Sequence, residues 1–185
     1  GDGDDIINGG VGDDTLNGDA GFNIIHGGDG IDNITNLDGE SYGEAGNDIM
    51  LGGGLLDGGD GNDTIFGSGS DDTLLGGAGN DTLKSSDGND EVQGGAGNDT
   101  IESSNGINHL YGGAGDDTIT SKATIFGSQA HMHYESGMDV FTGAIHSLDT
   151  IYFDDGSDLS DWELSLNGND LIMVKNAGVD EITIK

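Results

Sequence analysis

The chain has 185 residues, with 36 Asp and Glu against 4 Lys and Arg, so its formal net charge at neutral pH is −32. A chain with this much negative charge repels nucleic acid and anionic membranes, and its natural partners are cations or basic ligands. The 38 Gly without any Pro or Cys exclude collagen, proline-rich linkers, disulfide frameworks and zinc–thiolate sites. No apolar run approaches the roughly 18 residues of a membrane-spanning helix, so this fragment is not expected to insert into a membrane.

Residues 1–120 are built from a repeat of mostly nine residues with the consensus G-G-x-G-x-D-x-U-x, where U is apolar. Clear units are GGVGDDTLN (9–17), GGDGNDTIF (58–66) and GGAGNDTLK (76–84), and residues 1–8 are the tail of one more. Two units are shortened, NLDGESY (36–42) and GGGLLD (52–57). A period this short indicates a solenoid.

The end of each unit places one apolar residue between two outward ones, the pattern of a very short, half-buried strand. Such strands are not stable alone, so two units are expected to form one rung of about 18 residues, with rungs stacked in parallel at about 4.8 Å. The expected fold is all-β, a right-handed parallel β-roll. Its interior should be one column of apolar residues: Ile7, Leu16, Ile25, Ile34, Met50, Ile65, Leu74, Leu83, Val92, Ile101, Leu110 and Ile119.

Stacking alternate units divides the turns into two edges. The regular edge carries an Asp at the sixth position of every turn: Asp14, Asp32, Asp48, Asp63, Asp81, Asp99 and Asp117. The irregular edge keeps Asp72 and Asp90, but Asn23, Ser41 and Asn108 are taken as the sixth-position residues of other turns.

A column of stacked carboxylates needs a cation. Carboxylates about 5 Å apart repel by roughly 1 kcal/mol in water and by about 3 kcal/mol at an effective dielectric of 20. Ca²⁺ accepts six to eight carboxylate and carbonyl oxygens in flexible geometry, whereas Mg²⁺ needs a stricter octahedron. We therefore predict about six Ca²⁺ ions between the turns of the regular edge, and at least one more between Asp72 and Asp90.

The nonapeptides resemble the calcium-binding repeats of RTX proteins. The resemblance implies that the sixth-position Asp and the main-chain carbonyls of the first, second and fourth residues of each turn bind calcium. Carried over by position, the ligands are Gly9, Gly10, Gly12 and Asp14; Gly27, Gly28, Gly30 and Asp32; Gly43, Glu44, Gly46 and Asp48; Gly58, Gly59, Gly61 and Asp63; Gly76, Gly77, Gly79 and Asp81; Gly94, Gly95, Gly97 and Asp99; and Gly112, Gly113, Gly115 and Asp117. Glu44 departs from the usual Gly and should strain the backbone.

The same resemblance implies a protein that is secreted or displayed on the surface of a Gram-negative bacterium, that passes the type I secretion machinery and that folds when it meets calcium outside the cell. It also implies further domains upstream of this fragment, since the first unit begins in its middle.

Residues 121–185 leave the repeat and are expected to form a C-terminal β cap on the roll, residues 1–120. Strands are predicted at 149–153, 162–166, 170–175 and 180–184. The run DTIYFDDGSDLSDWELSLNGNDLIMV is similar to the segment that follows the repeats in haemolysin-related calcium-binding proteins. Such a cap would cover the last rung, whose open edge otherwise invites strand pairing between molecules.

The sequence also bears on functions other than calcium binding. No nucleophile-elbow, zinc-protease or phosphate-loop motif occurs, so the chain is not expected to be an enzyme. It could instead be an adhesin module that binds carbohydrate or a host surface through the irregular edge or residues 127–148, or the accessory tail of a protease, lipase or alginate epimerase. His131-Met132-His133, with His146 near along the chain, also offers imidazoles for a transition metal.

Overall fold

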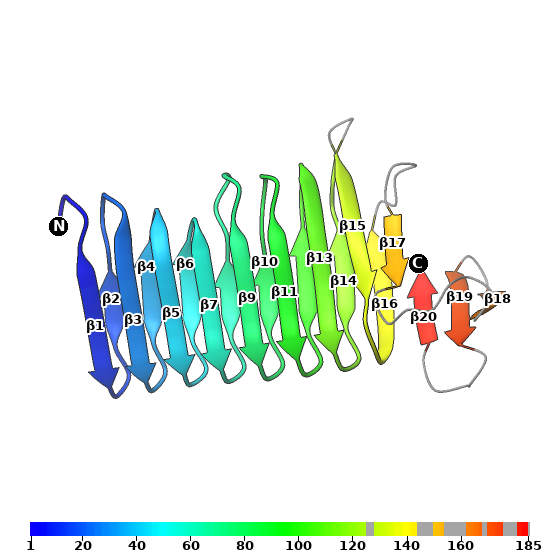
Figure 1. Cartoon of the computed structure of the whole chain (residues 1–185), viewed down its shortest axis with the longest axis horizontal. Helices are drawn as coiled ribbons and strands as arrows, with labels where there is room; N and C mark the ends of the chain where they lie inside the picture. The colour runs from blue at the N-terminus through cyan, green and yellow to red at the C-terminus, as the bar shows by residue number, and fades with distance from the viewer. Residues whose placement is uncertain (125–127, 144–149, 154–161, 168–169, 176–180, 185) are drawn as a thin grey trace.

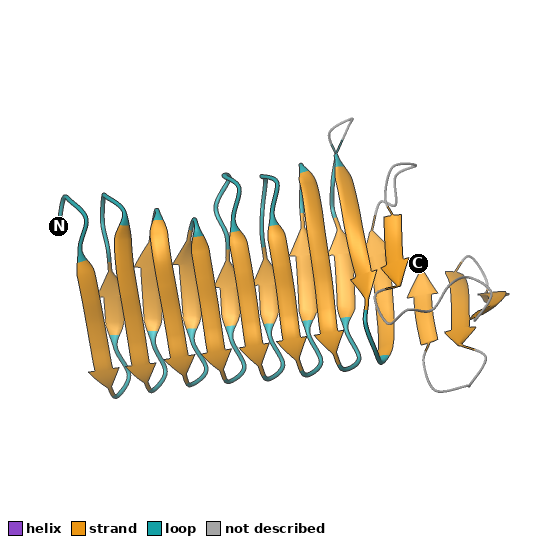
Figure 2. Cartoon of the chain, viewed as in Figure 1, coloured by secondary structure: helices purple, strands orange, loops and turns teal. Residues whose placement is uncertain are grey.

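The computed structural model describes residues 1–124, 128–143, 150–153, 162–167, 170–175 and 181–184. The chain winds into a long, flattened coil whose successive rungs lie side by side along one axis (Figure 1). Strands and short turns alternate throughout (Figure 2). None of the described residues is helical, so no membrane-crossing helix is found among them.

Two sheets face each other across a single layer of core side chains. The first has the order β1 (Ile6–Val11), β3 (Asn23–Asp29), β5 (Gly39–Ala45), β7 (Leu55–Asp60), β9 (Thr73–Ala78), β11 (Glu91–Ala96), β13 (Ile107–Ala114), β15 (Gln129–Tyr134), β17 (Thr150–Phe153). The second has the order β2 (Thr15–Asn17), β4 (Asn33–Asn36), β6 (Ile49–Gly52), β8 (Thr64–Phe66), β10 (Thr82–Lys84), β12 (Thr100–Ser103), β14 (Thr118–Ser121), β16 (Met138–Gly143), β20 (Glu181–Ile184), β19 (Asp170–Lys175), β18 (Trp162–Asn167). The predicted all-β parallel roll is confirmed.

Pairing along the first sheet, and along the second sheet from β2 to β20, is parallel and mostly joins residues one 18-residue rung apart, as Ile7 with Ile25 and Leu83 with Ile101. Side chains on one face of a strand therefore meet the equivalent side chains of the next rung. The rung is longer between β13 and β15, where Leu110 pairs with Met132.

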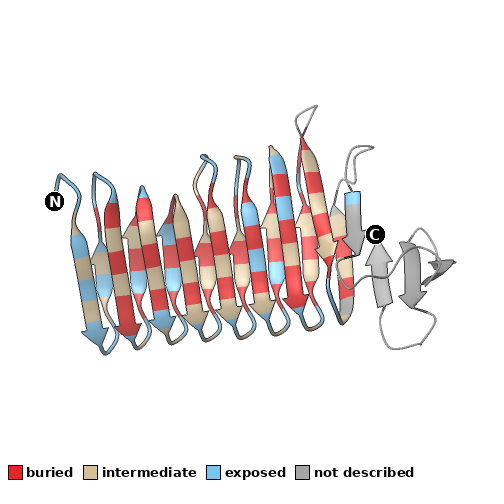
Figure 3. Ribbon diagram, in the orientation of Figure 1, coloured by how far each residue is buried: buried red, intermediate tan, exposed pale blue. Residues whose placement is uncertain are grey.

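The apolar column lies between the sheets as predicted. Its members from Ile25 to Ile119 are almost fully buried, whereas Ile7 and Leu16 at the first rung are partly buried. Buried residues alternate with intermediate or exposed ones along most of the length of the strands from β3 to β15 (Figure 3). The core also contains residues that the repeat pattern did not identify, namely Leu56, Ala130, Met132, Tyr134 and Phe141.

One prediction is wrong, at the shortened units. Ser41 is not a sixth-position turn residue, because it pairs with Ile25 and Leu56 in the core column, and Gly39 is the residue beside Asn23. In the next rung Gly54 takes the sixth position, since its N–H donates to Asp72 Oδ1 at 2.8 Å. The residues were lost from the turn rather than from the strand, because the strand register still places Ser41 and Leu56 at the inward positions.

All four strands predicted beyond residue 148 are present, as β17, β18, β19 and β20. The parallel sheets continue past residue 120 through β15 and β16, and β20 pairs in parallel with β16. β19 and β18 then add antiparallel strands to the end of the second sheet. The second sheet therefore ends in an antiparallel meander.

Candidate metal-binding edges

The turns of the regular edge follow the odd-numbered strands and form the lower edge in Figure 1. Each sixth-position carboxylate spans two turns, because its Oδ1 accepts the main-chain N–H of the sixth residue one turn earlier. The N–H of Asp63 donates to Asp81 Oδ1 at 2.7 Å, and that of Asp81 to Asp99 Oδ1 at 2.8 Å. The same bond joins Asp14 to Asp32, Asp32 to Asp48, Asp48 to Asp63, and Asp99 to Asp117.

The second oxygen of these carboxylates is buried and has no hydrogen-bond partner. This holds for Oδ2 of Asp32, Asp48, Asp63, Asp81, Asp99 and Asp117. A buried polar atom without a partner costs about 1–3 kcal/mol, and more when it is charged. Six such oxygens in one row are acceptors that cations could satisfy.

The first Gly of each turn lies beside that oxygen. A Cβ on Gly76 would lie 2.5 Å from Asp81 Oδ2 and would also meet the carbonyl oxygen of Gly94, one turn further on. A Cβ on Gly94 would meet Asp99 Oδ2 and, at 2.5 Å, the carbonyl oxygen of Gly112. An equivalent pair of oxygens, one from the Asp carboxylate of the same turn and one from a carbonyl of the next turn, lies beside Gly9, Gly27, Gly43 and Gly58. Carboxylate and carbonyl oxygens thus converge in a pocket that excludes any side chain, and these are the ligands that Ca²⁺ prefers.

Burial raises the pKa of these carboxyl groups. Desolvation brings the pKa of Asp63 and that of Asp99 to about 7, with smaller contributions from the neighbouring carboxylates. Desolvation also raises the pKa of Asp117 to about 6 and raises the pKa of Asp48 and of Asp81. These carboxyl groups therefore hold protons more readily than exposed ones do, and a divalent cation would displace those protons.

Glu44 occupies the second position of its turn, where the other regular turns have Gly. Its φ of 74° lies in the same positive region as the φ of 99° at Gly59. The predicted strain is confirmed, because a residue with a Cβ is disfavoured there by about 1–2 kcal/mol. Glu44 Oε1 and His26 Nδ1 are hydrogen-bonded at a distance of 2.8 Å.

The regular edge has an eighth turn, which was not predicted from the sequence. Asp139 is buried, and its Oδ1 accepts the N–H of Asp117 at 3.0 Å. Gly137, in the fourth position, has a φ of 100° and lies against the carbonyl oxygen of Gly115. The signal was present as G-x-D-x-U-x over residues 137–142, but it follows a rung lengthened to 22 residues.

A second ladder, also not predicted, runs along the fifth positions of the same turns. The N–H of Asn80 donates to Asn62 Oδ1 at 2.6 Å, and that of Asn98 to Asn80 Oδ1 at 2.7 Å. Asn62 and Asp116 donate in the same way to Asn47 and Asn98. In this ladder the side chain belongs to the earlier turn, so it runs opposite to the Asp ladder.

The irregular edge keeps one turn pair of the regular kind. The N–H of Asp72 donates to Asp90 Oδ1 and the N–H of Asp90 to Asn108 Oδ1, both at 3.0 Å. Asp90 Oδ2 is buried without a hydrogen-bond partner, and desolvation raises the pKa of Asp90 to about 6. Asp72 Oδ2 differs, because it accepts the N–H of Ser68 at 2.7 Å. The structure thus places Asp72 and Asp90 together, as expected.

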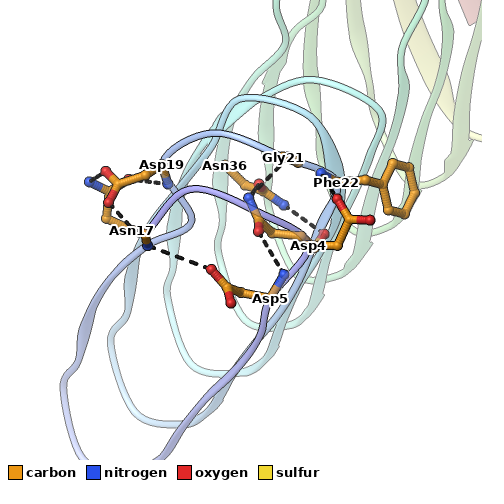
Figure 4. Close-up of polar contacts among 9 residues, drawn as sticks. Asp4, Asp5, Asn17, Asp19, Gly21, Phe22 and Asn36 are labelled. Atoms are coloured by element: carbon orange, nitrogen blue, oxygen red, sulfur yellow. Dashed lines mark hydrogen bonds and ion pairs between the residues drawn. The ribbon is translucent and has the colours of Figure 1, made fainter.

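Amide side chains replace carboxylates on the first rungs of the irregular edge (Figure 4). Asn23 Oδ1 accepts the N–H of Asp5 at 3.0 Å, and Asn23 Nδ2 donates to Asn36 Oδ1 at 3.3 Å. Asn36 Nδ2 donates to the carbonyl oxygen of Asn23 and to Ser41 Oγ. Amides carry both donors and acceptors, so this part of the edge is hydrogen-bonded without an ion.

The described residues contain no group of three or more His, Asp or Glu side chains that converges on one point. Metal binding at the turns must therefore combine single carboxylates with main-chain carbonyls. Tyr134 and Phe141 are buried in the core and form no exposed aromatic platform. The side chain of Trp162, and His146, lie outside the described residues.

Comparison with known families matches the chain to a calcium-binding repeat. The profile of the RTX calcium-binding nonapeptide repeat matches residues 1–34, 42–54, 55–83, 76–110 and 85–119. A search of curated proteins found no match. Repeats of this family form a calcium-binding structural module that is not catalytic by itself. Because this profile matches more than half of the residues of the chain, the chain belongs to the family of RTX calcium-binding repeat proteins.

Proposed function

We propose that calcium drives folding of this β-roll, and that the roll acts as the structural and export module of a secreted bacterial protein. The observation that carries the proposal is the row of buried Oδ2 atoms without partners, five of which, from Asp32 to Asp99, lie beside a main-chain carbonyl of the next turn. Calcium would supply the positive charge that the edge lacks, while the chain's own carboxylates and carbonyls would fix its place.

The ligands proposed are the sixth-position Asp residues and the first-, second- and fourth-position carbonyls of the regular turns. Six pockets lie between the seven turns from Asp14 to Asp117, which supports about six ions. Asp139 extends the column by one turn. On the irregular edge the pair Asp72 and Asp90 offers one more place, and Asp90 Oδ2 is the oxygen that lacks a partner there.

Export follows from the charge balance. Without calcium, a chain of net charge −32 has a thin core and a column of mutually repelling carboxylates, which favours the unfolded state. Calcium is scarce in the cytosol, and extracellular modules bind it with dissociation constants of about 10⁻⁴ to 10⁻³ M. The chain would pass a type I secretion channel unfolded and fold outside, attached to the domains of its parent protein. RTX repeats are typical of secreted proteins, which supports this location.

The test is a calcium titration of the purified chain at neutral pH, followed by far-UV circular dichroism and a count of bound ions by equilibrium dialysis. We expect a change from coil to β structure that chelator reverses, with about six ions or slightly more per chain. Mg²⁺ at the same concentration should be much less effective. A chain that is fully folded in chelator at neutral pH would contradict the proposal.

A further inference from the structure

Three of the five His residues lie together on the outer face of the first sheet. His109 is on β13, and His131 and His133 are on the neighbouring strand β15. His109 pairs in register with His131, and Tyr111 with His133. The alternating residues Leu110 and Met132 are buried in the core, so all three imidazoles project from the opposite face, where His109 is exposed and the other two are partly exposed.

The rings stand in a stack across the two strands. The ring centroids of His109 and His131 are 4.8 Å apart with an interplanar angle of 19°, and those of His109 and His133 are 6.1 Å apart. Tyr111 stacks on His133 with centroids 4.0 Å apart. Stacked rings cover one another's faces and turn their edges outward. The stack therefore offers ring edges rather than flat faces on which a sugar could stack, and Nε2 of His133 is buried among its neighbours.

We propose that His109, His131 and His133 bind one divalent transition-metal ion of the zinc class, at a site separate from the calcium turns. Imidazole nitrogen binds such ions at about 2.0–2.1 Å, which places the centroids of two rings on one tetrahedral ion roughly 5 Å apart. The observed centroid separations of 4.8 and 6.1 Å lie near this value. The backbone thus places His109 within this range of both His131 and His133.

Binding requires the rings to turn. In the structure His109 and His131 lie face to face, His133 is tilted against His109, and the three rings do not converge on one point. Rotation about χ1 and χ2 must bring the nitrogens together, and His131 Nε2 must leave its 3.2 Å hydrogen bond with Gln129 Oε1. The core side chains Leu110 and Met132 point to the opposite face of these strands, so the rotations leave them in place.

Ligand chemistry separates this site from the calcium edges. The turns offer carboxylate and carbonyl oxygens, which suit hard Ca²⁺, whereas imidazole suits zinc, copper and nickel. The net charge of −32 raises the concentration of cations near the surface. Glu91 on β11 pairs in register with His109 and adds a carboxylate beside the cluster.

The experiment is a Zn²⁺ titration of the calcium-saturated full chain by calorimetry, with histidine ring signals followed by NMR. We expect one ion that shifts the signals of His109, His131 and His133, and at least a tenfold loss of affinity in the double variant H109Q/H131Q. The matched control is His26→Gln, which removes an outward His of the same sheet that stacks on Tyr42 at 4.9 Å. This control should bind Zn²⁺ like the wild type.

Unchanged zinc affinity in H109Q/H131Q would overturn the proposal, as would an equal loss in His26→Gln. So would a stoichiometry that falls as calcium rises, because zinc would then be occupying the acidic turns. Far-UV circular dichroism of every variant in calcium checks that the roll has formed. That measurement shows a failure of calcium-driven folding independently of the zinc signals.

Discussion

Replacing Asp81 by Asn separates the two roles of a sixth-position carboxylate. Asp81 Oδ1 accepts the N–H of Asp63, while Oδ2 faces the pocket beside Gly76. An Asn keeps the first role, as Asn108 shows by accepting the N–H of Asp90 at 3.0 Å. It ends the second role, because an uncharged amide replaces the anionic ligand. Asp81→Asn should therefore weaken calcium binding with little effect on the hydrogen-bonded scaffold.

The magnitude follows from mass action. One ion at 100 times its dissociation constant stabilises the folded state by about 2.7 kcal/mol, and Asp81 Oδ2 borders one pocket. Losing that ion should lower the unfolding free energy by about the same amount, or lower Tm by roughly 5–11 °C for a chain of this size. The slope of unfolding free energy against ln[Ca²⁺] should also fall by about RT, the contribution of one ion.

The assay is urea unfolding followed by circular dichroism at several calcium concentrations. Asp60→Asn is the matched control, since it makes the same charge change at an exposed third-position residue of a regular turn. If Asp81→Asn left the calcium slope unchanged, or if Asp60→Asn reduced it equally, Asp81 would not be a calcium ligand.

Four further outcomes are expected. Asp81→Ala should cost about 1–3 kcal/mol more than Asp81→Asn at saturating calcium, since it also removes the acceptor of the Asp63 N–H; equal urea midpoints would contradict this. Glu44→Gly should raise stability by about 1 kcal/mol by relieving the positive φ, and a lower Tm would refute the strain. Asp139→Asn should remove one bound ion, as counted by dialysis, if the eighth turn takes part in binding. Since the pKa of Asp63 and of Asp99 rises to about 7 in the metal-free roll, against about 4 in the unfolded chain, acid should stabilise the calcium-free fold, and this stabilisation should disappear as pH rises through about 7. Circular dichroism in chelator between pH 4 and 8 tests that sign, and more β structure at pH 8 than at pH 5 would reverse it.

Periodicity made most of the fold predictable. A nine-residue repeat fixes which side chain points inward, so the core from Ile25 to Ile119 and the stacked Asp column followed directly from the sequence. Prediction was wrong where the period changed. In the shortened unit Ser41 was taken for a turn residue, because the sequence does not show whether the deletion falls in the turn or in the strand. Asp139 was missed because a longer rung put it out of phase.

Contacts between side chains that share no motif were beyond sequence reasoning. The Asn23 and Asn36 amide pair joins residues 13 apart in the sequence, a separation that the nine-residue repeat does not predict. The stack of His109 on His131 depends on the register between β13 and β15, which the lengthened rung determines. Neither could be obtained without knowing how many residues the intervening turn holds.

The two ladders of the regular edge run in opposite directions. A sixth-position Asp serves the turn before it, and a fifth-position Asn serves the turn after it, as Asp99 and Asn80 do for Asp81 and Asn98. Unfolding one interior turn would therefore leave a main-chain N–H without its acceptor on each of the two neighbouring turns. The repeats are consequently poor candidates for independent modules, and this side of the molecule should form and melt as one cooperative unit.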